Sequence, residues 1–151
     1  MKYGNNRCLL IENQSKIKIK EIVKELIHYW LQCLDKCEIL NIPKGELSVC
    51  FMDNQSLANL HHQYCGDSSN TDVITFQGDP TMDFAGELCI SLEMAIEQAK
   101  VRNLKMLDEV KLYFIHGCLH LSGLNDTTDQ QVKEMRIAEQ KCIKYLDKNG
   151  L

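Results

Sequence analysis

The apolar residues of this chain follow two patterns. Some form short, nearly continuous runs, as in strands, and others recur every three or four residues, as in helices. Four short runs are rich in apolar and β-branched residues, which is typical of buried or half-buried strands. These runs cover residues 7–12, 46–52, 72–76 and 87–91. Between the last two runs lie Gly78, Asp79, Pro80 and Asp83. These turn-forming residues predict an antiparallel connection.

Helical spacing occurs in five segments. The first covers residues 16–36, and the second covers residues 53–64 with Asp53 as its N-cap. Three more are expected after the last strand, at about 91–102, 105–122 and 128–148. Three consecutive helices after four strands predict an α+β fold, in which helices cover a mixed four-stranded sheet.

Length and composition are those of an ordinary globular protein. At 151 residues, the chain is expected to form a single domain over residues 1–151. Its apolar runs are too short to cross a bilayer, and its first residues lack the layout of a signal peptide. We therefore expect a cytoplasmic protein that has no membrane partner.

Eight cysteines are dispersed, mostly within apolar runs, and are expected to be reduced, buried thiols. Cys33 and Cys37 stand at helical spacing, but their segment lacks the further ligands of a zinc site. The net charge of −4 argues against tight non-specific binding to nucleic acid. Lysines near residues 16–24 and basic groups at 100–105 are most simply solvated surfaces.

The main candidate for chemistry is the segment from His116 to Asp126. On a helix, His116 and His120 lie one turn apart on the same face, close enough to bind one metal ion. Gly123 permits a chain reversal that can return Asp126 towards them. Two histidines, a carboxylate and an open fourth position form the ligand set of a catalytic zinc ion.

Two simpler interpretations compete with this metal site. The helix around the histidines is apolar on most sides, so His116 and His120 can be hydrogen-bonded core residues. Asp126 can be the N-cap of the next helix, where Thr128 and Gln131 stand at capping-box spacing.

Three segments resemble the YbeY family of bacterial endoribonucleases, which act in ribosomal RNA maturation. The most specific is His-Gly-x-Leu-His-Leu-x-Gly at residues 116–123. Residues 70–76 resemble the family's Pro-Thr-Asp-Val-Leu-Ser-Phe strand. Residues 86–91, followed by Ala95, Gln98 and Ala99, resemble its Gly-Asp-Ile-x-Ile-Ser strand and the next helix. The three segments keep the family's order.

This resemblance implies an α+β domain with the metal site on a central helix, beside the strand that ends at Phe76. It also implies one Zn²⁺ ion at His116, His120 and Asp126. Asp72 and Thr75 would line the catalytic cleft, and Asp67 could accept a proton. From the residues alone, Asp72 can simply begin a strand, and Asp67 can be a turn former.

Two positions depart from the family pattern. The family has a third histidine where this chain has Asp126, and a carboxylate leaves the bound metal less positive. The family usually has an arginine after the tyrosine at position 64, where this chain has Cys65. A thiol cannot make the bidentate contact that a guanidinium makes with phosphate.

Other polar or aromatic residues have plain structural explanations. His61 and His62 lie on a helix expected to be exposed, so solvated side chains are favoured over metal ligands. Trp30 belongs to the apolar stripe of the first helix and is expected in the core rather than stacked on a base.

Three functions remain open from the sequence. The first, implied by the resemblance, is a single-strand-directed, metal-dependent endoribonuclease in ribosomal RNA maturation, ribosome assembly and quality control. Its partners would be precursor ribosomal RNA and ribosomal proteins, with no DNA. The second is an RNA-binding assembly factor with a structural metal. The third is a metal hydrolase of a non-RNA substrate.

Overall fold

The computed structural model describes residues 7–66 and 71–151. A four-stranded sheet forms its centre, in the order β1 (Leu9–Asn13), β2 (Glu46–Met52), β4 (Phe84–Ser91) and β3 (Val73–Asp79). Strands β1, β2 and β4 are parallel, whereas β3 pairs with β4 in the antiparallel sense. The predicted α+β fold with a mixed sheet and an antiparallel final connection is confirmed.

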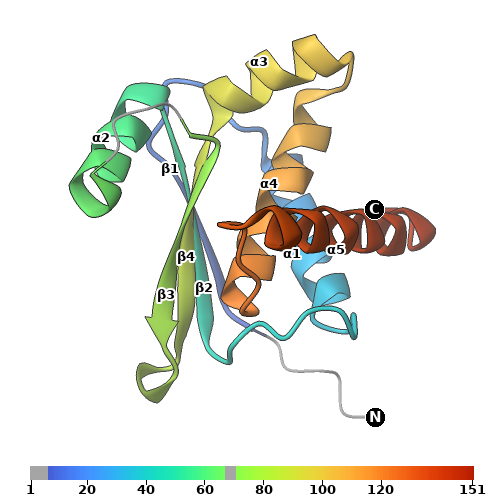
Figure 1. Ribbon diagram of the computed structural model, residues 1–151. Helices are drawn as coiled ribbons and strands as arrows, with labels where there is room; N and C mark the ends of the chain where they lie inside the picture. The colour runs from blue at the N-terminus through green and yellow to red at the C-terminus, as the bar shows by residue number, and fades with distance from the viewer. Residues whose placement is uncertain (1–6, 67–70) are drawn as a thin grey trace.

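Helices lie on both sides of this sheet, but unequally (Figure 1). Helices α1 (Glu21–Leu34), α4 (Met106–Leu121) and α5 (Asp129–Lys148) lie on one side, and α2 (Asn54–Cys65) lies on the other. Helix α3 (Leu92–Arg102) leads from the end of β4 to α4. Helix α4 packs against β3, β4, α3 and α5, so its central position is also confirmed.

The first helix begins five residues later than predicted, at Glu21. The Asn13 side chain donates to the Ile17 carbonyl at 2.7 Å and accepts from the Ser15 amide at 3.0 Å, which holds a bend after β1. Beyond this bend, Ile17 and Ile19 both pack against the core. Their period of two is that of extended chain, and it overlaps the helical pattern only by coincidence.

Strands β3 and β4 are longer than predicted and meet at a short 3-10 turn, Pro80–Met82. The Asp79 carboxylate accepts from the Thr81 amide at 3.0 Å and closes this turn. Asp53 does precede α2 as predicted, but its carboxylate caps no helical amide. It accepts instead from the Lys16 amide at 3.1 Å.

The main core lies between the sheet and the three helices α1, α4 and α5. Trp30 is fully buried there, as predicted, and its ring lies 6.1 Å from that of Phe114. Gly117 lets α4 approach the sheet closely, because a Cβ atom there would lie 2.6 Å from Leu88 Cδ2. The residues on either side of Gly117 are thereby fixed relative to β4.

All eight cysteines are unpaired, in agreement with the sequence prediction. Five are buried, whereas Cys8 and Cys65 are exposed. Across residues 7–66 and 71–151, no helix combines the length and apolarity that a membrane crossing needs.

Candidate metal centre

His116 and His120 lie in the last half of α4, with their rings 4.5 Å apart at the centroids and nearly perpendicular. Their Nε2 atoms are 3.0 Å apart. After α4 ends, Gly123 adopts a φ of +103° and the chain reverses, as its position in the sequence predicted. The reversal places Asp126 Oδ2 3.4 Å from His116 Nε2 and 3.5 Å from His120 Nε2.

These three atoms form a compact triangle that fits a small metal ion. Two ligand atoms at zinc-ligand distance in tetrahedral geometry stand about 3.3 Å apart. The observed separations of 3.0, 3.4 and 3.5 Å are close to that value. Without a cation or proton between them, the lone pairs of two neutral Nε2 atoms at this distance would repel each other.

Hydrogen bonds at the opposite ring nitrogens explain why both Nε2 atoms point inward. His120 Nδ1 lies 2.9 Å from the Leu124 carbonyl, and a carbonyl can only accept. His116 Nδ1 lies 2.8 Å from the Glu139 carboxylate. Both Nδ1 atoms therefore donate, which leaves both Nε2 lone pairs for a metal ion and fixes the two ring orientations.

Glu139 on α5 is only 1% exposed and also accepts from Arg136 Nη1 at 2.9 and 3.1 Å. Burial alone would raise the pKa of Glu139. The hydrogen bonds from His116 and Arg136, with the positive charge of the guanidinium, outweigh this effect and lower the pKa below its usual value. Glu139 is therefore an ionised carboxylate behind His116, an arrangement that makes an imidazole a better metal ligand.

Glu139→Gln is expected to weaken metal binding by about 10- to 100-fold, the usual cost of losing a partner that orients a ligand. The amide keeps the size of the side chain but loses the charge that strengthens the His116 imidazole. Metal affinity, measured by competition with a chelator, tests this prediction.

Glu109→Gln is the matched control, because Glu109 is a buried glutamate near the start of α4, paired with Arg102 at 3.4 Å. Its substitution can alter stability but should leave metal affinity unchanged. If both variants lost metal affinity equally, the effect of Glu139→Gln would come from a general loss of protein stability and not from its contact with His116.

The N-cap interpretation of Asp126 is wrong. Helix α5 begins at Asp129, and Thr128 is its N-cap, with the reciprocal hydrogen bonds to Gln131 that its sequence spacing predicted. The Asp126 carboxylate is thus free of capping and faces the histidines. The side chains of His116, His120 and Asp126 are 16, 23 and 37% exposed. Solvent therefore reaches the triangle, which the open position of a catalytic site requires.

Strand β3 lies beside this centre, because Gln77 Nε2 donates to the His120 carbonyl at 3.3 Å. Side chains alternate along a strand, so Thr75 and Val73 share the face of Gln77, towards α4. The Thr75 hydroxyl is shielded from solvent and has no hydrogen-bond partner among the described residues. Asp72 precedes β3, and its carboxylate accepts from the Val73 amide at 2.8 Å. Asp67 lies outside the described residues.

Cys65 is exposed at the end of α2, on the side of the sheet away from α4 (Figure 1). His62 is exposed as predicted, whereas His61 is half-buried, with its Nδ1 shielded from solvent. None of these three side chains belongs to the triangle of His116, His120 and Asp126.

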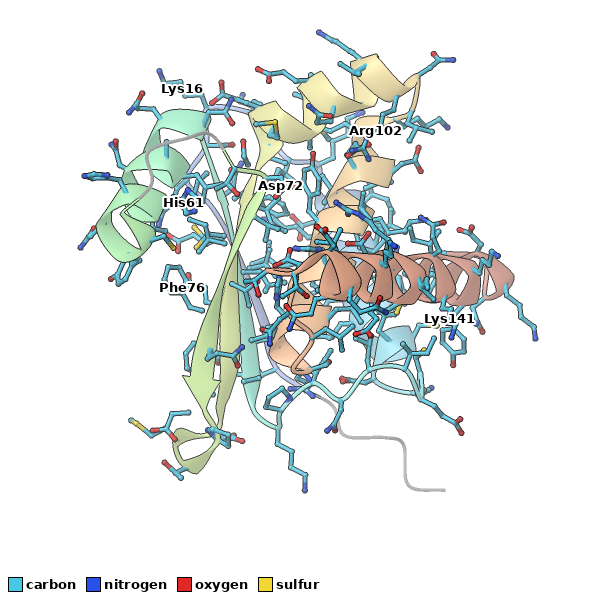
Figure 2. All side chains as sticks on the ribbon, in the orientation of Figure 1. Lys16, His61, Asp72, Phe76, Arg102 and Lys141 are labelled. Atoms are coloured by element: carbon cyan, nitrogen blue, oxygen red, sulfur yellow. The ribbon has the colours of Figure 1, made fainter. Side chains whose placement is uncertain are left out.

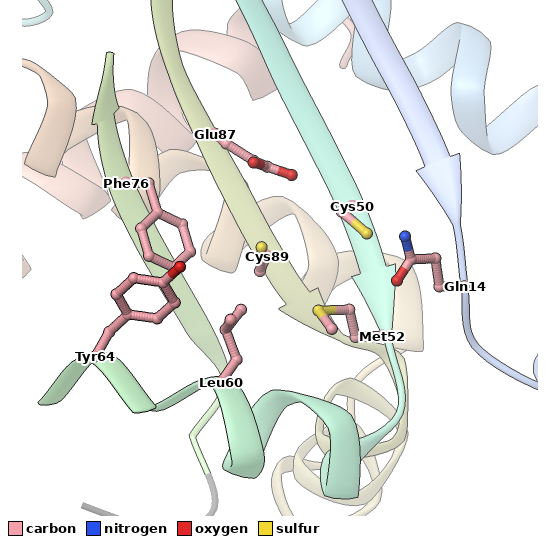
Figure 3. A pocket seen from close by; sticks show the side chains of 8 residues that line it. All are labelled: Gln14, Cys50, Met52, Leu60, Tyr64, Phe76, Glu87 and Cys89. Carbon is pink, nitrogen blue, oxygen red and sulfur yellow. The ribbon is translucent and has the colours of Figure 1, made fainter. Parts of the chain in front are cut away.

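A hollow of about 240 Å³ lies between α2 and the sheet, away from the triangle (Figure 3). Two thiols, Cys50 and Cys89, face it from adjacent strands, with the Tyr64 and Phe76 rings on one side. Burial raises the pKa of Cys50 to about 11 and that of Cys89 to about 12. At neutral pH both groups are protonated thiols, which are poor nucleophiles and poor metal ligands.

Sequence reasoning missed Glu139, Arg136 and the Leu124 carbonyl. A signal for Glu139 exists, since the buried stripe of α5 runs through Met135, Ala138, Glu139, Cys142 and Leu146. A glutamate on such a stripe needs a buried partner. The partner, His116, lies on another helix, and no spacing within α5 identifies it.

Comparisons with known proteins identify sequences that this chain resembles over most of its length. The family model described as Endoribonuclease YbeY matches residues 10–147. A protein of that name from Alkaliphilus oremlandii is 34% identical over 143 residues, covering 89% of this chain and 94% of the relative. One from Porphyromonas gingivalis is 28% identical over 130 residues, covering 86% and 85%.

The fold is also found in a solved structure. The solution structure of a Thermotoga maritima protein aligns with a TM-score of 0.61 and 22% identity. The alignment covers 91% of this chain and 87% of that one.

Proposed function

Because the chain belongs to the YbeY family of endoribonucleases, we propose that it is a metal-dependent endoribonuclease that cuts single-stranded RNA during ribosomal RNA maturation in the cytoplasm. The convergence of two imidazole Nε2 atoms and one carboxylate oxygen on a single point carries this proposal. Residues 1–151 would act as one domain, since one apolar core joins α1, α4 and α5 to the sheet.

His116, His120 and Asp126 would hold the metal ion, and we propose zinc. Two histidines with one carboxylate are a zinc ligand set of hydrolytic enzymes, and the set leaves a fourth position free. When bound, the ion would supply a Lewis acid at a phosphate oxygen or lower the pKa of a water molecule. Glu139 and the Leu124 carbonyl would keep the two imidazoles in place throughout the reaction.

Residues of β3 and of the segment before it would accept a proton from the RNA or donate a hydrogen bond to it. RNA carries its own nucleophile, the 2′-hydroxyl, which needs a group to accept its proton. Asp67 and Asp72 are the proposed acceptors. The Thr75 hydroxyl, which is shielded from solvent and has no hydrogen-bond partner in the part of the chain that the structure describes, is a proposed hydrogen-bond donor within the cleft.

The net charge of −4 gives the protein little general attraction for RNA. We propose that ribosomal proteins recruit it to precursor ribosomal RNA, in ribosome assembly and quality control. Local cations near the metal centre would then complete the binding of a phosphate.

The test measures metal content and cleavage of single-stranded RNA on the same preparation, before and after chelation. Cleavage that depends on zinc supports the proposal. A 2′,3′-cyclic phosphate at the new end would identify the 2′-hydroxyl as nucleophile, whereas a 5′-phosphate product would indicate attack by water. Bound metal without cleavage would favour an RNA-binding assembly factor, for which Cys65 in place of the family's arginine already argues.

A further inference from the structure

Arg136 is a cation that hydrogen bonds join to the metal centre through Glu139. Its Nη1 atom contacts both oxygens of the buried Glu139 carboxylate, at 2.9 and 3.1 Å. One of those oxygens, Oε1, also accepts from His116 Nδ1 at 2.8 Å. A single carboxylate oxygen therefore joins the guanidinium to a candidate metal ligand.

The rest of this guanidinium is open to solvent. The Arg136 side chain is 64% exposed, although its partner is only 1% exposed. A guanidinium carries five N–H donors in a rigid planar fork. The contacts through Nη1 hold one end of the guanidinium and leave Nε and Nη2 with no hydrogen-bond partner among the described residues. A held cation with free donors is suited to bind an anion.

Arg136 contacts one acidic group of the site, Glu139, and feels the charge of two more. The hydrogen bond to Glu139 raises the pKa of Arg136, burial opposes that shift, and the charges of Glu139, Asp72 and Asp126 raise the pKa further. Asp72 and Asp126 thus lie near enough to act on the guanidinium. These carboxylates would offset the positive charge of a bound metal ion, so a further positive group beside the centre would favour the approach of an RNA phosphate.

Three other basic groups of the described residues, Arg102, Lys16 and Lys141, do not supply it. Arg102 pairs with Glu109, which lies eleven residues before His120, or about 16 Å along the α4 axis. Figure 2 shows Lys16 near α2 and Lys141 well along α5. Cys65 offers no charge, and α2 lies across the sheet from the centre.

We propose that Arg136 binds a backbone phosphate of the RNA beside the metal centre. Arg136 would thus supply the positive charge that Cys65 cannot provide. This inference rests on the proposed function, because it takes single-stranded RNA as the ligand. Glu139 then has two tasks: one oxygen orients His116, and the carboxylate as a whole anchors the guanidinium. The same side chain would place the metal and the phosphate relative to each other.

Arg136→Gln, Arg136→Lys and Lys141→Gln test the proposal. Lys141 is exposed on the same helix, so Lys141→Gln matches the change in net charge. Each zinc-loaded variant is assayed for zinc content, for cleavage of single-stranded RNA, and for binding of a 2′-O-methylated RNA strand at several salt concentrations. Recovery of intact strand confirms that binding alone is measured.

Arg136→Gln is expected to keep its zinc and to bind the strand roughly 10-fold more weakly, as loss of a hydrogen bond to a charged group implies. The plot of log K against log salt should become shallower, with the magnitude of its slope smaller by about 0.7, the value for one phosphate contact on a single strand. Arg136→Lys should retain that slope but lose part of the affinity, because an ammonium lacks the planar fork. Lys141→Gln should behave as wild type.

Unchanged RNA binding by Arg136→Gln, with wild type still cleaving RNA, would overturn this inference and leave the proposed function standing. Loss of zinc without loss of RNA affinity would also overturn it, by showing that Arg136 acts only through Glu139 and His116. A wild-type protein that neither binds nor cuts RNA would overturn the proposed function itself.

Discussion

His120→Ala and His116→Ala should each lose most of the bound zinc and, with it, RNA cleavage. Each change removes one corner of the triangle formed by two Nε2 atoms and Asp126 Oδ2. Loss of a residue that merely orients a ligand costs about 10- to 100-fold in metal affinity, so loss of a ligand should cost at least as much. Metal content after dialysis and the initial rate on single-stranded RNA measure the two effects.

His62→Ala provides the control, because His62 is an exposed histidine on α2, across the sheet from α4. It should keep both zinc and activity. Thermal unfolding of the three metal-free variants separates loss of ligands from loss of fold. Full zinc occupancy in both His116→Ala and His120→Ala would show that the metal site has been assigned to the wrong residues.

Local patterns predicted the parts of this site that are close in sequence. A spacing of four places two side chains on one helix face, whatever the rest of the fold does. A glycine after the helix permits the reversal that returns Asp126, six residues beyond His120. The metal triangle is thus contained in eleven residues, and one turn of helix with one chain reversal is enough to build it.

The support of the site could not be predicted in the same way. Glu139 reaches His116 only because α5 packs against α4 beside His116. The way in which two helices pack depends on side chains from the whole core. The predicted start of the first helix was wrong for a related reason. Ile17 and Ile19 fit both a helical and an extended pattern, and hydrogen bonds of the Asn13 side chain decide between them.

Asp126→Ala should weaken zinc binding by about 10-fold or more, because a ligand costs at least as much as a residue that orients one. The structure simplifies this prediction, since Thr128 caps α5 and Asp126 has no capping role to lose. Asp126→His should preserve the site and restore the family's three-histidine set. Isothermal titration with zinc, together with the midpoint of unfolding, distinguishes metal affinity from stability.

Asp126→Asn is the decisive variant, because it keeps the shape of the side chain and removes its negative charge. As a ligand, Asp126 contributes that charge directly to the ion, so the amide should bind zinc much more weakly than wild type. Asp129→Asn is the matched control: it makes the same change three residues later, in the exposed first turn of α5. Zinc affinity of Asp126→Asn equal to that of wild type and Asp129→Asn would falsify the ligand assignment. Asp126 would then be only a partner of protonated histidines, and two imidazoles alone are too few to hold a catalytic metal ion.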